Sequence, residues 1–135
     1  MNGKLLAGLL FATLALPTKY ATAYDTERVK RNLSDDLVHC TVFYQFGVLS
    51  AREAKRKDIE TAANTSKDNS LALLVALRPQ KEEIPKIEAD IEVSLRQFAG
   101  AIKKDGWPRL ILQYGDLCQQ LLENPKARIQ YWIDK

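Results

Sequence analysis

Apolar side chains recur at three- and four-residue steps over most of this chain, and that spacing limits its fold more than any other feature. Side chains at these steps lie on one face of an α-helix, whereas a half-buried strand would alternate apolar and polar residues. The clearest run consists of Ile84, Ile87, Ile91, Leu95, Phe98 and Ile102. No segment alternates like a strand, so we predict an all-α fold.

The first helix is predicted to run from about Thr26 to Lys57. Its apolar stripe contains Leu33, Leu37, Cys40, Tyr44, Gly47 and Ala51. The small members of this stripe would let a neighbouring helix approach closely. The polar segment NTSKDNS, residues 64–70, is rich in residues that favour turns and predicts a loop. A short second helix over residues 71–77 would then end before Pro79.

Proline and glycine set the limits of the remaining helices. A third helix is predicted to begin near Pro85 and to end at Gly106, because proline is tolerated in a first turn and glycine terminates helices. A fourth begins at Pro108, and Asn124-Pro125 ends it before a short amphipathic tail. Four helices joined by short links predict a compact antiparallel bundle.

Residues 1–23 are typical of a cleavable secretory signal peptide. Lys4 supplies a basic start, and the apolar run from Leu5 to Leu16 has the length of a signal core. A membrane-spanning helix needs about 20 apolar residues, so a retained anchor is the weaker interpretation. The small residues before Tyr24 place the cleavage after Ala23. The chain would then consist of a signal peptide, 1–23, and a single helical domain, 24–135, that is periplasmic or secreted.

The charge of the mature domain argues against a polyanionic partner. Loss of Lys4 and Lys19 lowers the formal net charge from +3 to about +1. The remaining charges alternate in sign, as in Arg52-Glu53-Ala54-Lys55, whereas a nucleic-acid binder needs a clustered basic face. We therefore expect neither nucleic acid nor an anionic membrane surface as a partner.

The two cysteines, Cys40 and Cys118, are predicted to form a disulfide. Export places them in an oxidising compartment, where a pair in a small domain is more often bonded than catalytic or metal-binding. Both lie on or beside apolar stripes, so packing of the first helix on the fourth would bring them together. The sequons at Asn32 and Asn64 would matter only in a eukaryotic source.

The sequence contains no pattern typical of catalysis, metal binding or cofactor binding. His39 is the only histidine, and its neighbour Cys40 would point about 100° away on a helix, which makes no chelating pair. Haem attachment and di-iron motifs are absent. The acidic residues Glu82, Glu83, Glu88, Asp90 and Glu92 could be interpreted as a calcium site or as paired catalytic carboxylates. A solvated helix face explains them better, because Glu88 and Glu92 are four residues apart on the face opposite the Ile stripe. We predict no catalytic residue, no metal ligand and no cofactor.

Two short stretches of the sequence share a pattern of cysteines and aromatics. They contain Cys40 with Phe43-Tyr44, and Tyr114, Cys118, Leu121-Leu122, Asn124-Pro125, Arg128 and Tyr131-Trp132. In this respect the chain resembles uncharacterised small exported helical proteins of bacteria, which carry an early Cys followed by aromatics and a late Tyr-x-x-x-Cys. The resemblance implies a periplasmic helical fold with a disulfide, and no activity.

A small exported domain without catalytic residues generally works through its surface, so we expect this protein to bind another exported or envelope protein. Inhibitor, immunity and assembly-factor roles all fit, and none involves catalysis. The alternative is a carrier of a small apolar ligand held between helices, with Phe43, Phe46, Phe98 and Tyr114 as lining or simply as core. An enzyme of unknown class is the third hypothesis.

The signal-peptide prediction can be checked by mass. Intact-mass analysis of the exported protein should give a chain that begins at Tyr24 or within a few residues of it, because the small residues at Ala21 and Ala23 fit a signal peptidase. Recovery of the full-length chain in the membrane fraction would contradict the prediction.

Overall fold

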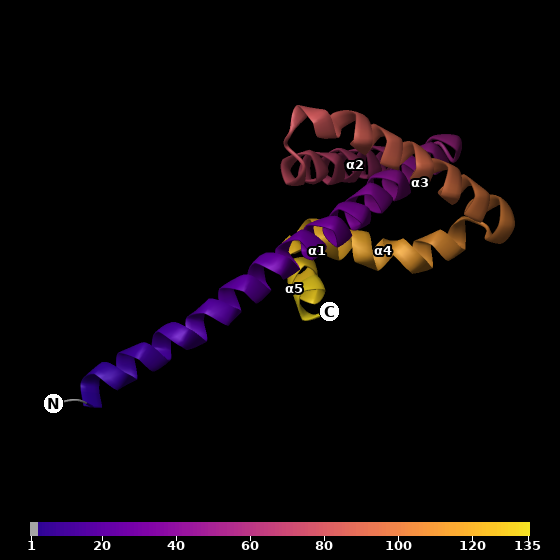
Figure 1. The fold of residues 1–135 in the computed structure, drawn as a ribbon. Helices are drawn as coiled ribbons and strands as arrows, with labels where there is room; N and C mark the ends of the chain where they lie inside the picture. Colours follow the sequence, from indigo (N-terminus) through magenta and orange to yellow (C-terminus); the bar gives the residue numbers. More distant parts are fainter. Residues whose placement is uncertain (1–2) are drawn as a thin grey trace.

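In the computed structural model the described backbone, residues 3–135, is helical and contains no strand (Figure 1). Its elements are α1 (Gly3–Glu53), α2 (Lys57–Leu77), the 3₁₀ turn η1 (Lys81–Glu83), α3 (Ile84–Asp105), α4 (Trp107–Glu123) and α5 (Pro125–Asp134). The all-α class is confirmed. The bundle differs from the predicted four helices, because the described chain contains a fifth, α5, where the sequence predicted only a tail.

Side chains are described from residue 26 onward. Residues 1 and 2 lie outside the described residues altogether, and the side chains of the predicted signal segment and of its cleavage site, Ala23 and Tyr24, lie outside them too. Within the described residues, no helix combines the length and the apolar character needed to span a membrane.

Helix α1 is the axis on which the other helices pack. Along the chain, α1 to α4 run alternately in opposite directions, and the N-terminal part of α1 extends beyond the other helices (Figure 1). Each of α2, α3, α4 and α5 contacts α1. At Gly47, an added Cβ would lie 3.6 Å from the Cβ of Ala63, so the small residue on α1 brings α2 close, as the sequence predicted.

The turn between α1 and α2 lies at Ala54–Arg56, so the predicted end of the first helix at Lys57 was too late. Lys55 adopts the left-handed conformation with φ 57°. The backbone N–H of Arg56 donates to the carbonyl of Ala51 at 2.8 Å, and that of Lys55 donates to Arg52 at 3.1 Å. This pair of bonds is a Schellman motif, in which glycine is the usual left-handed residue. A lysine there gives no sequence signal for the turn.

The predicted loop at residues 64–70 was wrong, because this segment forms the middle of α2. Its hydroxyl groups bond to the preceding helical turn: Thr65 donates to the carbonyl of Thr61 at 3.1 Å, and Ser70 donates to that of Ser66 at 2.9 Å. Such bonds let serine and threonine remain in a helix. Ser70 is fully buried, so a residue that favours turns in isolation here serves as a small packing residue.

The boundaries of the later helices agree with the prediction. Helix α3 carries Pro85 in its first turn and ends before Gly106, whose φ of 83° disfavours any residue with a Cβ. Helix α4 ends at Glu123, and the side chain of the next residue, Asn124, accepts a hydrogen bond from the N–H of Ala127 and caps α5.

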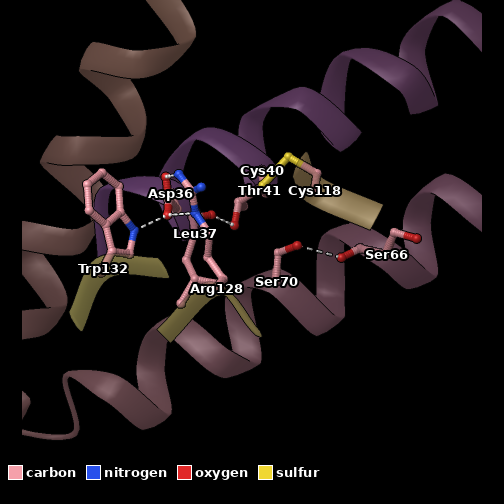
Figure 2. The surroundings of a disulfide bond; sticks show 9 residues. All are labelled: Asp36, Leu37, Cys40, Thr41, Ser66, Ser70, Cys118, Arg128 and Trp132. Carbon is pink, nitrogen blue, oxygen red and sulfur yellow. Dashed lines mark hydrogen bonds and ion pairs between the residues drawn. A yellow bond between two sulfur atoms is a disulfide. The ribbon is translucent and has the colours of Figure 1, made fainter. Parts of the chain in front are cut away.

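The core forms around the disulfide. Cys40 on α1 and Cys118 on α4 are bonded, with their Cα atoms 5.4 Å apart, as the sequence predicted (Figure 2). Both are fully buried, among large side chains from three helices such as Leu37, Leu74 and Leu121. The bond therefore joins the first helix to the fourth at the centre of the apolar cluster.

Loss of this bond should destabilise the protein strongly. The cysteines are 78 residues apart, and the chain-entropy estimate for a loop of that size is about 4.5 kcal/mol. Cys40→Ser and Cys118→Ser should each lower the free energy of unfolding in urea by a comparable amount. The double variant should cost no more than either single one, because each removes the same bond. Additive losses would contradict this account.

Candidate functional site

Within the described residues, no group of three or more His, Cys, Asp and Glu side chains could hold a metal ion. His39 lies half-buried against two aromatic rings, with centroid distances of 6.0 Å to Phe98 and 5.7 Å to Tyr114. Its surroundings are thus those of a packed ring beside the core.

The aromatics considered as a ligand lining pack on one another. Ring centroids are 4.8 Å apart for Phe98 and Tyr114, and 6.3 Å apart for Phe46 and Phe98. Phe43 stacks on Trp107 at 5.3 Å. Burial raises the pKa of the Tyr114 hydroxyl, and the negative charge of Asp36 adds to the rise. Tyr114 therefore stays neutral at ordinary pH, as expected for a residue within this aromatic cluster.

Asp36 on α1 is the centre of a polar cluster that holds α5 (Figure 2). Its carboxylate accepts hydrogen bonds from Arg128 Nε at 2.7 Å, Arg128 Nη2 at 3.1 Å and Trp132 Nε1 at 2.7 Å. The guanidinium also lies over the ring of Tyr131, 4.3 Å from its centroid. The Asp36 hydrogen bond raises the pKa of Arg128. We call these four residues the Asp36 cluster.

The acidic residues predicted on a solvated face divide into two groups. Glu88 is exposed, and Glu92 is exposed and pairs with Arg96 within α3. Glu83 and Asp90 instead converge on Arg78, whose guanidinium lies 2.8 Å from each carboxylate and which also donates to Ser34 at 3.3 Å. Arg78 thereby ties the end of α2 to η1, α3 and α1. Ser34 lies 44 residues from Arg78 in the sequence, which hid the link to α1.

The surface carries an open groove where α1, α2 and α4 meet, with a volume of about 570 Å³. It is lined by Phe43, Tyr44, Gly47, Ser50, Ala51, Ala54, Arg56, Ile59, Ala62, Ala63, Ser66, Trp107 and Ile111. We call it the α1–α2–α4 groove. Its lining is almost entirely small or apolar, and Ile59 and Ile111 remain 45% and 46% exposed. In the sequence, only the small residues of α1 indicated this groove.

No family model, curated protein or solved structure matches this chain.

The Asp36 cluster should contribute measurably to stability. Asp36→Ala leaves the partly buried Arg128 and the Trp132 N–H without their acceptor, and should lower the free energy of unfolding by about 3 kcal/mol. Hydrogen exchange of residues 125–134 should also become faster, because α5 loses its anchor.

Glu92→Ala is the matched control for Asp36→Ala, because it breaks the exposed pair with Arg96 and should change stability by less than about 0.5 kcal/mol. If both variants unfold at the same urea concentration, the Asp36 cluster does not anchor α5.

Proposed function

We propose that this protein binds another exported or envelope protein through the α1–α2–α4 groove and performs no catalysis. The observation that carries the proposal is the groove itself, an open and mainly apolar hollow of about 570 Å³ in which Ile59 and Ile111 remain exposed. An inhibitor, an immunity protein or an assembly factor would each use such a surface. A periplasmic or secreted location fits the buried disulfide.

The shape of the groove suits one face of a helix. Its lining includes the small residues Gly47, Ala51 and Ala63, which leave room for the side chains of a partner. It also includes two exposed aliphatic side chains, Ile59 on α2 and Ile111 on α4. An amphipathic helix that lays its apolar side chains into such a hollow is a common mode of peptide recognition. The partner we propose is therefore a helix with a stripe of large aliphatic or aromatic side chains.

The charge at one end of the groove sets a further requirement on the partner. The turn between α1 and α2 presents Lys55 and Arg56, and α2 begins with Lys57. Asp58 pairs with Arg56 at 3.1 Å. The excess of positive charge there favours an acidic residue at the corresponding end of the bound helix. The apolar groove and its basic end thus specify one kind of partner, a helix with an apolar stripe and an acidic residue at one end.

A carrier of a small apolar ligand is the second candidate function. It is favoured by a different observation, an aliphatic groove of about 290 Å³ beside α5.

The docking proposal predicts the effect of filling the groove. Ala62 lines it and is exposed, so Ala62→Trp should leave the fold intact and block the partner helix. Capture of the partner from native periplasm by the mature chain should fall at least tenfold, the loss expected when a central contact of an interface is blocked. A photo-crosslinker at Ile59 should attach to the same captured protein.

Ala89→Trp on α3 is the matched control, because it places the same side chain at another exposed alanine. A protein captured equally by both tryptophan variants, or crosslinked as well from Glu88 as from Ile59, would show that the groove is not the docking surface.

A further inference from the structure

Helix α5 is held to α1 by polar contacts, although it packs over apolar residues. None of its side chains is fully buried. The Asp36 cluster fixes one side of the helix, where Arg28 also donates to the backbone carbonyl of Trp132 at 3.3 Å. On its other side, Ile129 and Ile133 border a groove that no described side chain fills.

This groove, which we call the α5 groove, has a volume of about 290 Å³. It is lined by Thr26, Val29, Lys30, Leu33, Leu77, Ile129 and Ile133. Val29 and Leu33 are one helical turn apart on α1, and Ile129 and Ile133 are one turn apart on α5, so two aliphatic rows line the groove. The volume lies just below the usual range for ligand sites, about 300–1,000 Å³, which suits a single alkyl chain better than a helix.

A charged cleft of about 550 Å³ adjoins the α5 groove, because Lys30 and Leu77 line both. The cleft is lined by Glu27, Lys30, Arg31, Ser34, Asp35, Leu77, Arg78, Gln80, Glu83 and Asp90. We call it the Arg78 cleft. An aliphatic space therefore lies beside a polar one, with Lys30 and Leu77 at their common border, which is the arrangement that an amphiphile requires.

The charges of the Arg78 cleft differ in how well they are already paired. Arg78 is neutralised by Glu83 and Asp90 at 2.8 Å each. Among the described residues, Lys30 has only a long contact of 3.7 Å with Glu27, and both side chains are more than half exposed. Arg31 and Asp35 are exposed and make no hydrogen bond or ion pair with the part of the chain that the structure describes. Charges of both signs thus remain available to a ligand.

We propose that the α5 groove and the Arg78 cleft together bind a single-chain zwitterionic amphiphile. The alkyl chain lies between the aliphatic rows of α1 and α5, and the anionic part of the head group meets Lys30 and Arg31. Its cationic part meets Asp35 and Glu27. A purely anionic or cationic head group would bring its charge close to residues of the same sign, which is unfavourable. This site lies apart from the α1–α2–α4 groove, so either can exist without the other.

The probe for this site is dodecylphosphocholine, used below its micelle concentration with the whole mature chain. Calorimetric titration should give one saturable site, and hydrogen exchange of residues 125–134 should slow on binding, because the alkyl chain contacts Ile129 and Ile133. Dodecanoate and dodecyltrimethylammonium should bind at least tenfold more weakly. Phosphocholine alone should not compete, because it lacks the chain.

Two variants test the two halves of the site. Ile133→Lys places a charge in the α5 groove and should weaken binding more than tenfold, and Lys30→Glu removes the cation shared by the two spaces and should weaken it about tenfold. Val75→Lys and Lys103→Glu are the controls, since Val75 is 44% exposed on α2, close to the 46% of Ile133, and Lys103 is exposed on α3. Both controls should bind like the wild type.

Three results would overturn the proposal. They are the absence of saturable binding of dodecylphosphocholine, equal losses in the test and control variants, and binding of dodecanoate as tight as that of the zwitterion. Near-ultraviolet circular dichroism identifies any variant that fails to fold. In that case Ile129→Gln replaces Ile133→Lys as the test of the α5 groove.

Discussion

The bond between Cys40 and Cys118 holds α4 against the middle of α1, and the positions of the last two helices depend on it. Asp36 lies one helical turn before Cys40 on α1. The disulfide that holds α4 and the carboxylate that holds α5 are therefore neighbours. Because α4 is fixed on α1 and the link at Asn124 is short, α5 begins close to α1, and its Arg128 and Trp132 reach Asp36. Helix α5 therefore reaches its place without a buried apolar side chain of its own.

The limits of α3 and α4 could be predicted because their signals are local. Pro85 and Gly106 act through their own backbone conformation, which does not depend on the rest of the fold. The turn at Lys55 depends instead on the pairing of α1 with α2, which makes a strained conformation tolerable for a lysine. The prediction of a loop at residues 64–70 was wrong for a different reason. These residues favour turns, but tertiary packing overrode that preference and kept them in α2.

The candidate sites were less visible in the sequence than the helices. Small residues such as Gly47 indicated that a helix would approach closely, but not that the approach would leave a groove beside Ile59 and Ile111. The partners of Asp36 lie 92 and 96 residues away, and no local pattern connects them. Charged residues that form clusters only after folding look like ordinary surface residues in a sequence.

The complete burial of both sulfur atoms also sets an order of events. An oxidant or an oxidoreductase must touch a thiol to act on it, and in the closed bundle neither Cys40 nor Cys118 can be reached. The bond must consequently be made while α4 is still detached from α1, at a time when the chain is open. Oxidation then precedes final packing, and a chain that closed too early would trap its thiols in the reduced form.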